Sequence, residues 1–396
     1  MTSSACSKRE PPSPASDPRF ARLSATSVFA GGGLGRWSTA TLGVVGGGVI
    51  GGRLCVEAVL SGIGTVLVWD SDRIERVNQG NQFGQPGRAK VDAIVQRCDA
   101  IRPGHAAGFD CDVRHAGIRQ LARCDVLVDA SDDARLAWPL TEISNGLGVP
   151  LLRAAVDGSG QLEFGRVLCS SCEGGHACQL CSYSMEDLMR VRGPTPCPRP
   201  GSRPGGDPEP TRTGGAMGAV IAGIALLQAQ RLVTGNDLDC VLDRELIVDL
   251  SHLQLLPLKL SRSDACISGH CRWRWIDLDG NAREISLADA FAAARQHHRA
   301  GAIRLEVYLL PLNDQAVCPC GAVRPAVGTD RLTPPRCNAC GRPMRWLGAV
   351  QRPSVDAAFA AEAGVLHQPL ARLGVPDGAM LVARAPARPA LRMLLR

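Results

Sequence analysis

Short apolar runs alternate with helical stretches along the first two thirds of the chain. Residues 42–45 (LGVV), 65–69 (TVLVW) and 125–129 (DVLVD) are runs of the kind that a parallel sheet buries. Helical segments follow the first two of these runs, over residues 52–60 and 91–101. This alternation predicts an α/β fold with a Rossmann-like, doubly wound, mostly parallel sheet.

The same pattern continues to about residue 271. A helix of small apolar residues over 216–232 would pack tightly on the sheet, and strand-like segments over 245–260 would complete it. We therefore expect one domain over residues 19–271, with further strands at 150–155 and 160–168.

Stretches without periodicity separate this domain from the rest. Residues 1–18 are rich in Ser and Pro and are expected to be disordered, and residues 182–213 form a Pro-, Gly- and Arg-rich loop. After residue 271 the character changes. We expect a second module over residues 272–350 and a small folded appendage over residues 351–396, for which the pattern indicates no function.

A glycine-rich turn follows the first strand. Gly46, Gly48 and Gly51 fit G-x-G-x-x-G, which lets the backbone approach a phosphate at a helix N-terminus. Asp70 follows the second strand, about 20 positions after the glycines, where an acidic residue usually holds a nucleotide ribose. Alone, these features predict a bound nucleotide, with an NAD(P)-dependent oxidoreductase as the default interpretation.

Polar residues after Asp70 narrow that interpretation. Asp72, the run Asn78-Gln79-Gly80-Asn81-Gln82 and Lys90 follow in order. Together with the glycine turn they resemble the ThiF/MoeB/HesA group, the E1-like enzymes that activate ubiquitin-like proteins. The pattern of that group is GxGGxG, D-x-D, N-x-x-R-Q and a downstream Lys. Asn81 departs from it, because the family usually has Arg there, so one positive charge is missing.

The resemblance implies an adenylyltransferase that uses ATP and Mg²⁺. Asp70 would hold the ribose, and Lys90 would act as a catalytic cation near the triphosphate. Groups of this kind stabilise negative charge that develops at the α-phosphate. The nucleotide-binding positions that the resemblance implies are Gly46, Gly48, Gly51, Asp70, Asp72, Asn78, Asn81 and Gln82.

Two more catalytic positions follow from the resemblance. Asp132 matches the carboxylate that handles Mg²⁺ in the D-x-x-D-N block of the family, with Asp133 in place of the common Asn. A helix N-cap is the structural alternative for Asp132. Arg22 matches an Arg that, in the family, crosses a homodimer interface to the ATP of the partner, and a solvated charge at a helix start is its alternative.

Two sets of cysteines have the spacing of zinc ligands. In the first set, Cys178 and Cys181 match one half of the family's structural zinc site. The second half departs from C-x-x-C, so that His270 could replace one thiolate. The candidate ligands of this first site are Cys178, Cys181, Cys266 and Cys271, and Cys169 and Cys172 could instead combine with the 178/181 pair.

The second set predicts a zinc ribbon. Two close cysteine pairs, each followed by Gly, flank a polar and turn-rich segment. Four thiolates leave no open coordination position, so the role would be structural or partner-binding, and disulfides are the alternative. The ligands would be Cys318, Cys320, Cys337 and Cys340.

A further thiol lies in the loop over residues 182–213. In the resembled enzymes this is a crossover loop that covers the tail of the ubiquitin-like substrate. Thr211 stands where thioester-forming members place a Cys, and Thr is a poor acyl acceptor at neutral pH. Cys197 is therefore the candidate catalytic thiol, with an incidental loop cysteine as the alternative.

Composition adds exclusions. The 396 residues are 45% hydrophobic and 21% charged, as in an ordinary soluble protein. A net charge of +6 with 4% aromatic residues argues against a nucleic-acid partner. The apolar stretch 216–227 is too short to cross a bilayer, and no signal-peptide pattern opens the chain. We therefore expect a cytoplasmic protein with no membrane partner, whose 17 cysteines serve metal or thiol chemistry.

The sequence thus predicts an E1-like activating enzyme that forms a homodimer. Its substrate would be a ubiquitin-like or sulfur-carrier protein, and an E2-like conjugating enzyme would be a further partner. Two alternatives stay open: an NAD(P)-dependent oxidoreductase, and a catalytically impaired E1-like scaffold, which Asn81 and Thr211 favour. Conjugation, sulfur transfer and peptide modification are not distinguished.

Overall fold

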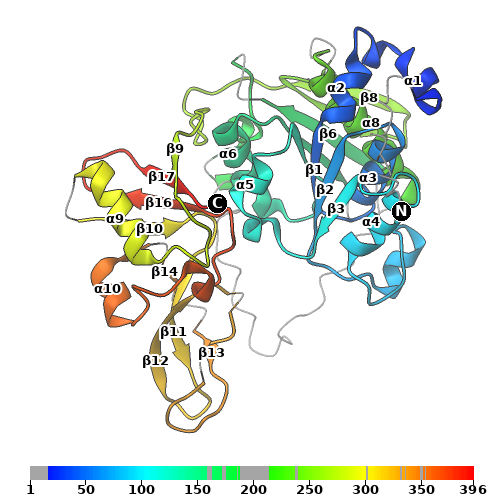
Figure 1. Cartoon of the computed structure of the whole chain (residues 1–396). Helices are drawn as coiled ribbons and strands as arrows, with labels where there is room; N and C mark the ends of the chain where they lie inside the picture. Colours follow the sequence, from blue (N-terminus) through cyan, green and yellow to red (C-terminus); the bar gives the residue numbers. More distant parts are fainter. Residues whose placement is uncertain are drawn as a thin grey trace, which may run out of the picture. The chain divides into compact units, whose positions relative to one another are not determined.

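Two compact units make up the part of the chain that the structure describes (Figure 1). One unit contains the chain up to Asp110 together with Cys124–Cys271, and the other contains Cys111–Arg123 together with Arg272–Arg396. The computed structural model describes residues 17–157, 163–171, 175–184, 186–187, 214–236, 240–299, 302–330, 332–334, 336–347, 351–352 and 354–396.

An eight-stranded sheet forms the centre of the first unit, in the order β3-β2-β1-β4-β5-β6-β7-β8. The pairs from β3 to β5 are parallel, and β6, β7 and β8 continue the sheet in antiparallel pairs. The predicted Rossmann-like α/β fold is confirmed. The strands are β1 (Thr41–Val45), β2 (Thr65–Trp69), β3 (Ala106–Phe109), β4 (Val126–Asp129), β5 (Leu151–Val156), β6 (Phe164–Ser170), β7 (Arg244–Asp249) and β8 (Gln254–Lys259).

Helix α3 (Gly51–Leu60) contacts α4 (Lys90–Asp99) and α8 (Gly215–Thr234), and all three helices contact strands of this sheet. Their apolar side chains share a core with alternate residues of the parallel strands, such as Val44 and Val128. Helix α6 contacts β5 and the 3₁₀ turn η7. The remaining helical elements of this unit are η2 (Pro18–Phe20), α1 (Ala21–Ser24), η3 (Ser27–Phe29), α2 (Gly33–Thr39), η4 (Arg76–Gly80), η6 (Ala134–Leu136), α6 (Ala137–Leu147) and η7 (Gln179–Ser182).

Helix α8 is longer than the apolar stretch that we judged too short to cross a bilayer. It has 20 residues, and by length and composition alone it could span a membrane. Ile221, Ala222, Ala225 and Ala229 are nevertheless buried in the core of the sheet unit. The core helix of a folded domain passes the same test, so the length of α8 is weak evidence for a span.

The second unit has a five-stranded sheet, β15-β10-β16-β17-β9, and a smaller sheet in which β11 pairs with β12, β13 and β14. Helices α9 (Leu287–His298) and α10 (Ala357–Glu362) begin at the N-caps Ser286 and Asp356. The strands are β9 (Trp275–Asp277), β10 (Arg304–Val307), β11 (Leu312–Val317), β12 (Val323–Gly328), β13 (Arg345–Trp346), β14 (Gln351–Arg352), β15 (Val355–Asp356), β16 (Met380–Arg384) and β17 (Leu391–Leu394).

Two of the expected boundaries differ from the structure. Strand β16 pairs with β10 and β17 pairs with β9, so residues 351–396 share a sheet with residues before 310 and are not a separate appendage. A pair of strands buries too little apolar surface to be stable alone. The other difference is that Cys111–Arg123, between β3 and β4, belongs to the second unit, which interrupts the expected continuous domain over 19–271.

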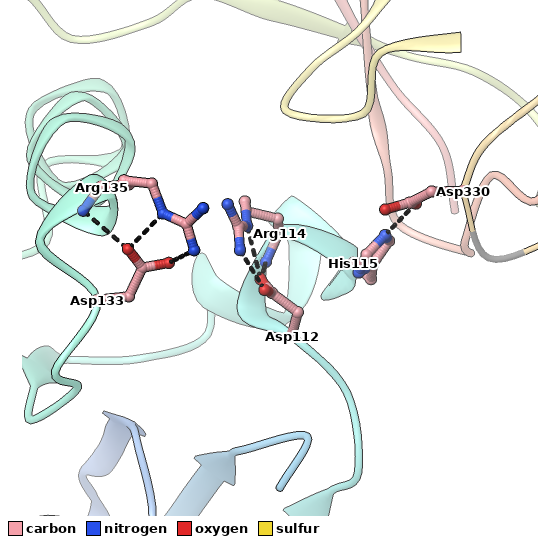
Figure 2. Close-up of polar contacts among 6 residues, drawn as sticks. All are labelled: Asp112, Arg114, His115, Asp133, Arg135 and Asp330. Atoms are coloured by element: carbon pink, nitrogen blue, oxygen red, sulfur yellow. Dashed lines mark hydrogen bonds and ion pairs between the residues drawn. The ribbon is translucent and has the colours of Figure 1, made fainter. Parts of the chain in front are cut away.

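Hydrogen bonds and an ion pair explain why this inserted segment belongs to the second unit. It contains η5 (Val113–His115) and α5 (Ile118–Leu121). The Arg119 guanidinium donates to Asp277 Oδ1 at 2.5 Å and to the Leu395 carbonyl at 2.9 Å. His115 Nε2 lies 3.1 Å from Asp330 Oδ1 (Figure 2). The expected disorder of residues 1–18 concerns mostly residues outside the described part, although Asp17 and Pro18 begin η2.

Candidate active site

The glycine turn after β1 forms the centre of the site. Gly46 has φ +93°, and a Cβ on it would lie 2.8 Å from the backbone nitrogen of Ser131, just beyond β4. A Cβ on Gly51 would lie 1.9 Å from the carbonyl oxygen of Gly46. A Cβ on Gly48 would meet no atom within 4 Å. The backbone is therefore tightly packed at both ends of the turn and open at Gly48, as a phosphate-binding turn requires.

Asp70 joins this turn to the D-x-D segment. Its Oδ2 accepts a 2.6 Å hydrogen bond from the backbone N–H of Gly47, and its Oδ1 accepts a 2.7 Å bond from that of Asp72. Burial raises the pKa of Asp70, although the charge of Lys90 and the two backbone N–H groups favour the carboxylate. Asp70 thus contacts the glycine turn directly, and its role in holding a ribose stays a prediction.

Lys90 begins α4 and brings a positive charge to the same place. Its Nζ donates to Asp72 Oδ2 at 2.8 Å, and its side chain is 12% exposed. Burial alone would lower the pKa of Lys90, but the charges of Asp70, Asp72 and Asp132 and the bond to Asp72 raise it overall. The amine is therefore protonated at neutral pH. The end of β4 lies beside the same turn, because a Cβ on Gly46 would be 2.8 Å from the backbone nitrogen of Ser131, the neighbour of Asp132.

Asp132 and its neighbour Asp133 have different roles. Asp133 is the N-cap of η6 and accepts from the backbone N–H of Arg135 at 2.9 Å and from its guanidinium Nε at 2.7 Å (Figure 2). The N-cap interpretation therefore applies to Asp133 and is wrong for Asp132, whose side chain is exposed. An exposed carboxylate at this edge of the sheet is a suitable oxygen ligand for phosphate-bound Mg²⁺.

The segment around η4 holds the remaining predicted nucleotide residues. Asn78 Oδ1 accepts from the backbone N–H of Glu75 at 2.9 Å, so this side chain caps its own turn. Gln82 Oε1 is buried with no hydrogen-bond partner among the described residues. Asn78 therefore has a local structural role, which the sequence pattern did not indicate.

Arg53, on α3, is a functional candidate that sequence reasoning missed. Its Nη1 donates to the carbonyl oxygens of Asn81 at 2.7 Å and Val49 at 2.9 Å. It thereby ties the glycine turn to the segment whose usual Arg is replaced by Asn81, and it brings a guanidinium there. The signal was present in the sequence, because Arg53 is the one basic residue in an otherwise largely apolar helix.

Two predicted catalytic residues are not brought into this cluster by the described structure. Arg22 lies exposed on α1. Cys197 lies outside the described residues, as does most of the loop predicted over residues 182–213.

The first predicted metal site forms with one changed ligand. Cys178 Sγ lies 3.8 Å from Cys181 Sγ and 3.6 Å from Cys266 Sγ, and His270 Nε2 lies 3.1 Å from Cys181 Sγ. Cys271 is exposed and donates to the Gly269 carbonyl instead, so its prediction as a ligand is wrong.

The turn before Cys271 explains this exchange. Gly269 and His270 both have positive φ, at 65° and 46°, and His270 rather than Cys271 joins the cluster. Three thiolates and one imidazole nitrogen within 4.8 Å of one another fit tetrahedral Zn²⁺. Cys169 is instead buried beside Cys240, with 3.7 Å between the sulfurs, and Cys172 lies outside the described residues.

The second cluster forms as predicted. Cys318 and Cys320 follow β11, and Cys337 and Cys340 precede β13, with all four sulfurs within 4.8 Å. Gly321 and Gly341 have positive φ after each pair and let the turns fold back under the sulfurs. Four thiolates fit a closed Zn²⁺ site. None of these four cysteines forms a disulfide, which argues against the disulfide alternative.

Comparison with known proteins identifies the family. A model of the ThiF family matches residues 20–267. The chain belongs to the ThiF family. The E1-like resemblance seen in its motifs is therefore confirmed, and family membership argues against the NAD(P)-dependent oxidoreductase alternative. No curated protein sequence matches the chain.

Solved structures share the fold of this ThiF-family chain. E. coli MccB in complex with succinimide has a TM-score of 0.52 at 16% identity, over 66% of this chain and 76% of that one. E. coli MccB with ATP has a TM-score of 0.51 at 16% identity, over 65% and 76%. At this identity the likeness concerns the fold, and the family match carries the assignment.

Proposed function

We propose that this ThiF-family protein is an ATP-dependent, E1-like adenylyltransferase that activates the C-terminal carboxylate of a polypeptide. The observation that carries the proposal is that Asp70, Lys90 and the segment after β4 that carries Asp132 lie beside the open glycine turn, at the carboxyl edge of the parallel strands. The ATP-bound structure of MccB, which shares this fold, supports the choice of nucleotide.

The proposed reaction needs no protein nucleophile. A carboxylate oxygen of the polypeptide attacks the α-phosphorus of ATP, the bond to the β-phosphate oxygen breaks, and pyrophosphate leaves with the electron pair. Lys90 and Arg53 offset the charge that develops on the phosphates, and Asp70 holds the ribose. Asp132 holds Mg²⁺, which neutralises phosphate charge when it is bound.

The polypeptide substrate is a ubiquitin-like or sulfur-carrier protein with a free C-terminal carboxylate. A short peptide is the second candidate. Structures of MccB, the microcin C7 biosynthetic enzyme, in complex with N-formylated MccA favour it, because they share this fold.

Finer parts of the proposal rest on the family resemblance. Arg22, exposed on α1, reaches the ATP of a partner subunit in a homodimer. With a carrier substrate, the Cys197 thiolate attacks the carbonyl carbon of the acyl adenylate and AMP leaves, which forms a thioester for transfer to an E2-like conjugating enzyme. A cytoplasmic location suits free thiolates that bind zinc.

ATP–pyrophosphate exchange tests the main proposal. Full-length protein would be assayed with small ubiquitin-like carriers and short peptides, each ending in a free carboxylate. We expect exchange with at least one of them, and a fall of about 100-fold or more in Asp132→Ala. Asp133→Ala is the matched control, because this neighbouring carboxylate caps η6 and pairs with Arg135.

Each result has a distinct meaning. Exchange that persists in Cys197→Ala, with a thiol-labile adduct that is lost in that variant, supports both steps. No exchange with any carrier or peptide, despite ATP binding, contradicts adenylation and favours the E1-like scaffold alternative.

A further inference from the structure

A polar pocket lies on the antiparallel side of the large sheet. Arg153 on β5 is directly opposite Leu168 on β6, which is directly opposite Glu245 on β7, so these three side chains share one face. Residues of η7 and its C-terminal neighbour close the pocket. Its lining consists of Arg153, Arg166, Leu168, Gln179, Ser182, Tyr183 and Glu245.

Arg153 is buried in the floor of this pocket without adequate partners. The residue is 8% exposed, and its Nε and Nη1 atoms are buried with no hydrogen-bond partner in the part of the chain that the structure describes. The nearest opposite charge among the described residues is Asp129 at the end of β4, whose Oδ2 lies 3.8 Å from Arg153 Nε. That separation is too long for a hydrogen bond. A buried cation with unused donors is costly in the empty protein.

Asp129 stays at ion-pair distance and makes no hydrogen bond to Arg153: its Oδ2 is itself buried with no hydrogen-bond partner among the described residues. Its Oδ1 accepts from the backbone N–H of Ser131 at 3.1 Å and from the Ser131 hydroxyl at 2.6 Å. These bonds hold the carboxylate against the end of β4. The Arg153 guanidinium therefore retains donors for an external acceptor with two oxygens, the geometry that guanidinium groups bind best.

The pocket also holds an unused acceptor. Gln179 donates from Nε2 to the Tyr183 hydroxyl at 2.9 Å, while its Oε1 is buried and has no hydrogen-bond partner among the residues that the structure describes. At the rim, Arg166 pairs with Glu245 at 3.3 Å. A ligand that satisfies the floor must therefore present an anion to Arg153 and a hydrogen-bond donor to Gln179.

A carboxylate on a peptide meets both requirements. Its two oxygens fit Arg153, and a nearby peptide N–H can donate to Gln179. A free hydrogen phosphate dianion also carries an O–H donor, but Asp129 and Glu245 would repel its second charge. Asp129, which lies beside Arg153, is three residues before the proposed catalytic residue Asp132.

We propose that this pocket binds an acidic side chain of the polypeptide that the enzyme adenylates, with Arg153 as the residue that selects the carboxylate. The identity of the ligand as part of the substrate rests on the proposed function. The selectivity of the pocket for a carboxylate next to an amide N–H does not.

Two small probes test the selectivity directly. N-acetyl-glutamate methylamide carries the carboxylate and amide N–H groups, and N-acetyl-glutamine methylamide lacks only the charge. Binding of each to the full-length protein would be measured by ligand-observed NMR at pH 7, with inorganic phosphate as a third probe. We expect saturable binding of the glutamate probe and about ten-fold weaker binding of the other two.

Variants locate the binding. Arg153→Met should weaken the glutamate probe about ten-fold, and Arg153→Lys should recover part of the loss, because lysine keeps the charge but not the fork. Arg244→Gln is the matched control, since this exposed arginine lies on β7 but does not line the pocket. If Arg153→Met fails to fold, the comparison of the two amino-acid probes on the wild-type protein still decides.

Several outcomes would overturn the proposal. These are equal affinity for the glutamate and glutamine probes, tighter binding of phosphate, full binding in folded Arg153→Met, or no saturable binding at about 10 mM glutamate probe. ATP–pyrophosphate exchange, measured separately, distinguishes the two proposals. Probe selectivity without exchange contradicts only the enzymatic function, and exchange without selectivity contradicts only the pocket.

Discussion

The charged side chains at the carboxyl edge of the large sheet shift the pKa values of one another. Lys90 forms an ion pair with Asp72. The negative charges of Asp70, Asp72 and Asp132 raise its pKa, so the amine stays protonated despite its burial. A cation held in place before the nucleotide binds needs little reorganisation when charge develops on the phosphates. This preorganisation makes Lys90 the residue whose loss should affect chemistry most directly.

Replacement of Lys90 tests that role. Lys90→Ala should lower the rate of ATP–pyrophosphate exchange about 100-fold or more, because no other side chain occupies its position at the start of α4. The matched control is Lys259→Ala, which removes an exposed lysine on β8 and should leave the rate unchanged. Equal rates in the wild-type protein and Lys90→Ala would contradict the assignment.

The sequence predicted these residues better than it predicted their partners. Asp70, Lys90 and Asp132 follow from ordered motifs that place them after strands or at a helix start, which local patterns reveal. The exchange of Cys271 for His270 depends on two successive positive φ angles, at Gly269 and His270. Residue spacing does not encode such a turn, and the same is true of the distant contact between Arg53 and Asn81.

A second single-residue effect concerns pH. Burial would raise the pKa of Asp112, but the hydrogen bonds and charge of Arg114 lower it overall (Figure 2). A carboxyl with a lowered pKa in the folded state contributes stability above its unfolded pKa of about 3.9. That contribution disappears as the pH falls through the folded pKa.

The melting temperature should therefore fall below about pH 4, and less steeply in Asp112→Asn than in the wild-type protein. Differential scanning calorimetry between acidic and neutral pH measures both slopes. Asp279→Asn serves as the control, because its side chain is 88% exposed. Identical slopes in Asp112→Asn and the wild-type protein would argue against this contribution.

At the scale of elements, the glycine turn joins β1 to α3 through backbone contacts that exclude side chains. Gly51→Ala would place a Cβ 1.9 Å from the Gly46 carbonyl, whereas Gly48→Ala would meet nothing within 4 Å. We expect Gly51→Ala to lower the free energy of unfolding by about 1–3 kcal/mol, as overpacking typically does. Urea denaturation measures this.

The control for Gly51→Ala lies within the same turn. Gly48→Ala should fold with nearly wild-type stability but bind ATP more weakly, because the new methyl group occupies the open side of the turn. A loss of stability in Gly48→Ala that matches the loss in Gly51→Ala would show that the turn tolerates no side chain at all, contrary to this geometry.

The two metal clusters are also properties of elements, because each brings together two short turns. We expect two zinc ions per chain by elemental analysis, since four ligand atoms lie within 4.8 Å in each cluster. His270→Ala should retain one ion and Cys271→Ser should retain two, because His270 lies in the cluster and Cys271 does not. Loss of an ion in Cys271→Ser would mean that Cys271 is a zinc ligand after all, as its spacing in the sequence predicted.

At the scale of the whole molecule, the boundary between the two units does not follow the order of the chain. Local periodicity correctly predicts the strands on either side of Cys111–Arg123, but it cannot reveal that this segment packs with residues beyond 272. The information lies in contacts between residues far apart in sequence. Arg119 alone joins the backbone or side chains of Asp277, Gly378 and Leu395.

This arrangement predicts that Arg119 contributes to the stability of the second unit. Arg119→Ala removes the guanidinium bonds to Asp277 and Leu395, and we expect it to destabilise the second unit by about 1 kcal/mol, since the side chain is 40% exposed and its ion pair is screened. The calorimetric transition of this unit should shift to lower temperature, while zinc content stays unchanged.

Arg123→Ala is the matched control for that experiment, because Arg123 is an exposed arginine at the end of the same segment. A chain cut after residue 271 extends the argument. It would leave Cys111–Arg123 without Asp277, Gly378 and Leu395, so it should be less soluble than the full chain even though it retains every strand of the large sheet. A soluble and fully stable truncated chain, with a normal melting transition for Arg119→Ala, would mean that the segment packs with the second unit without depending on it.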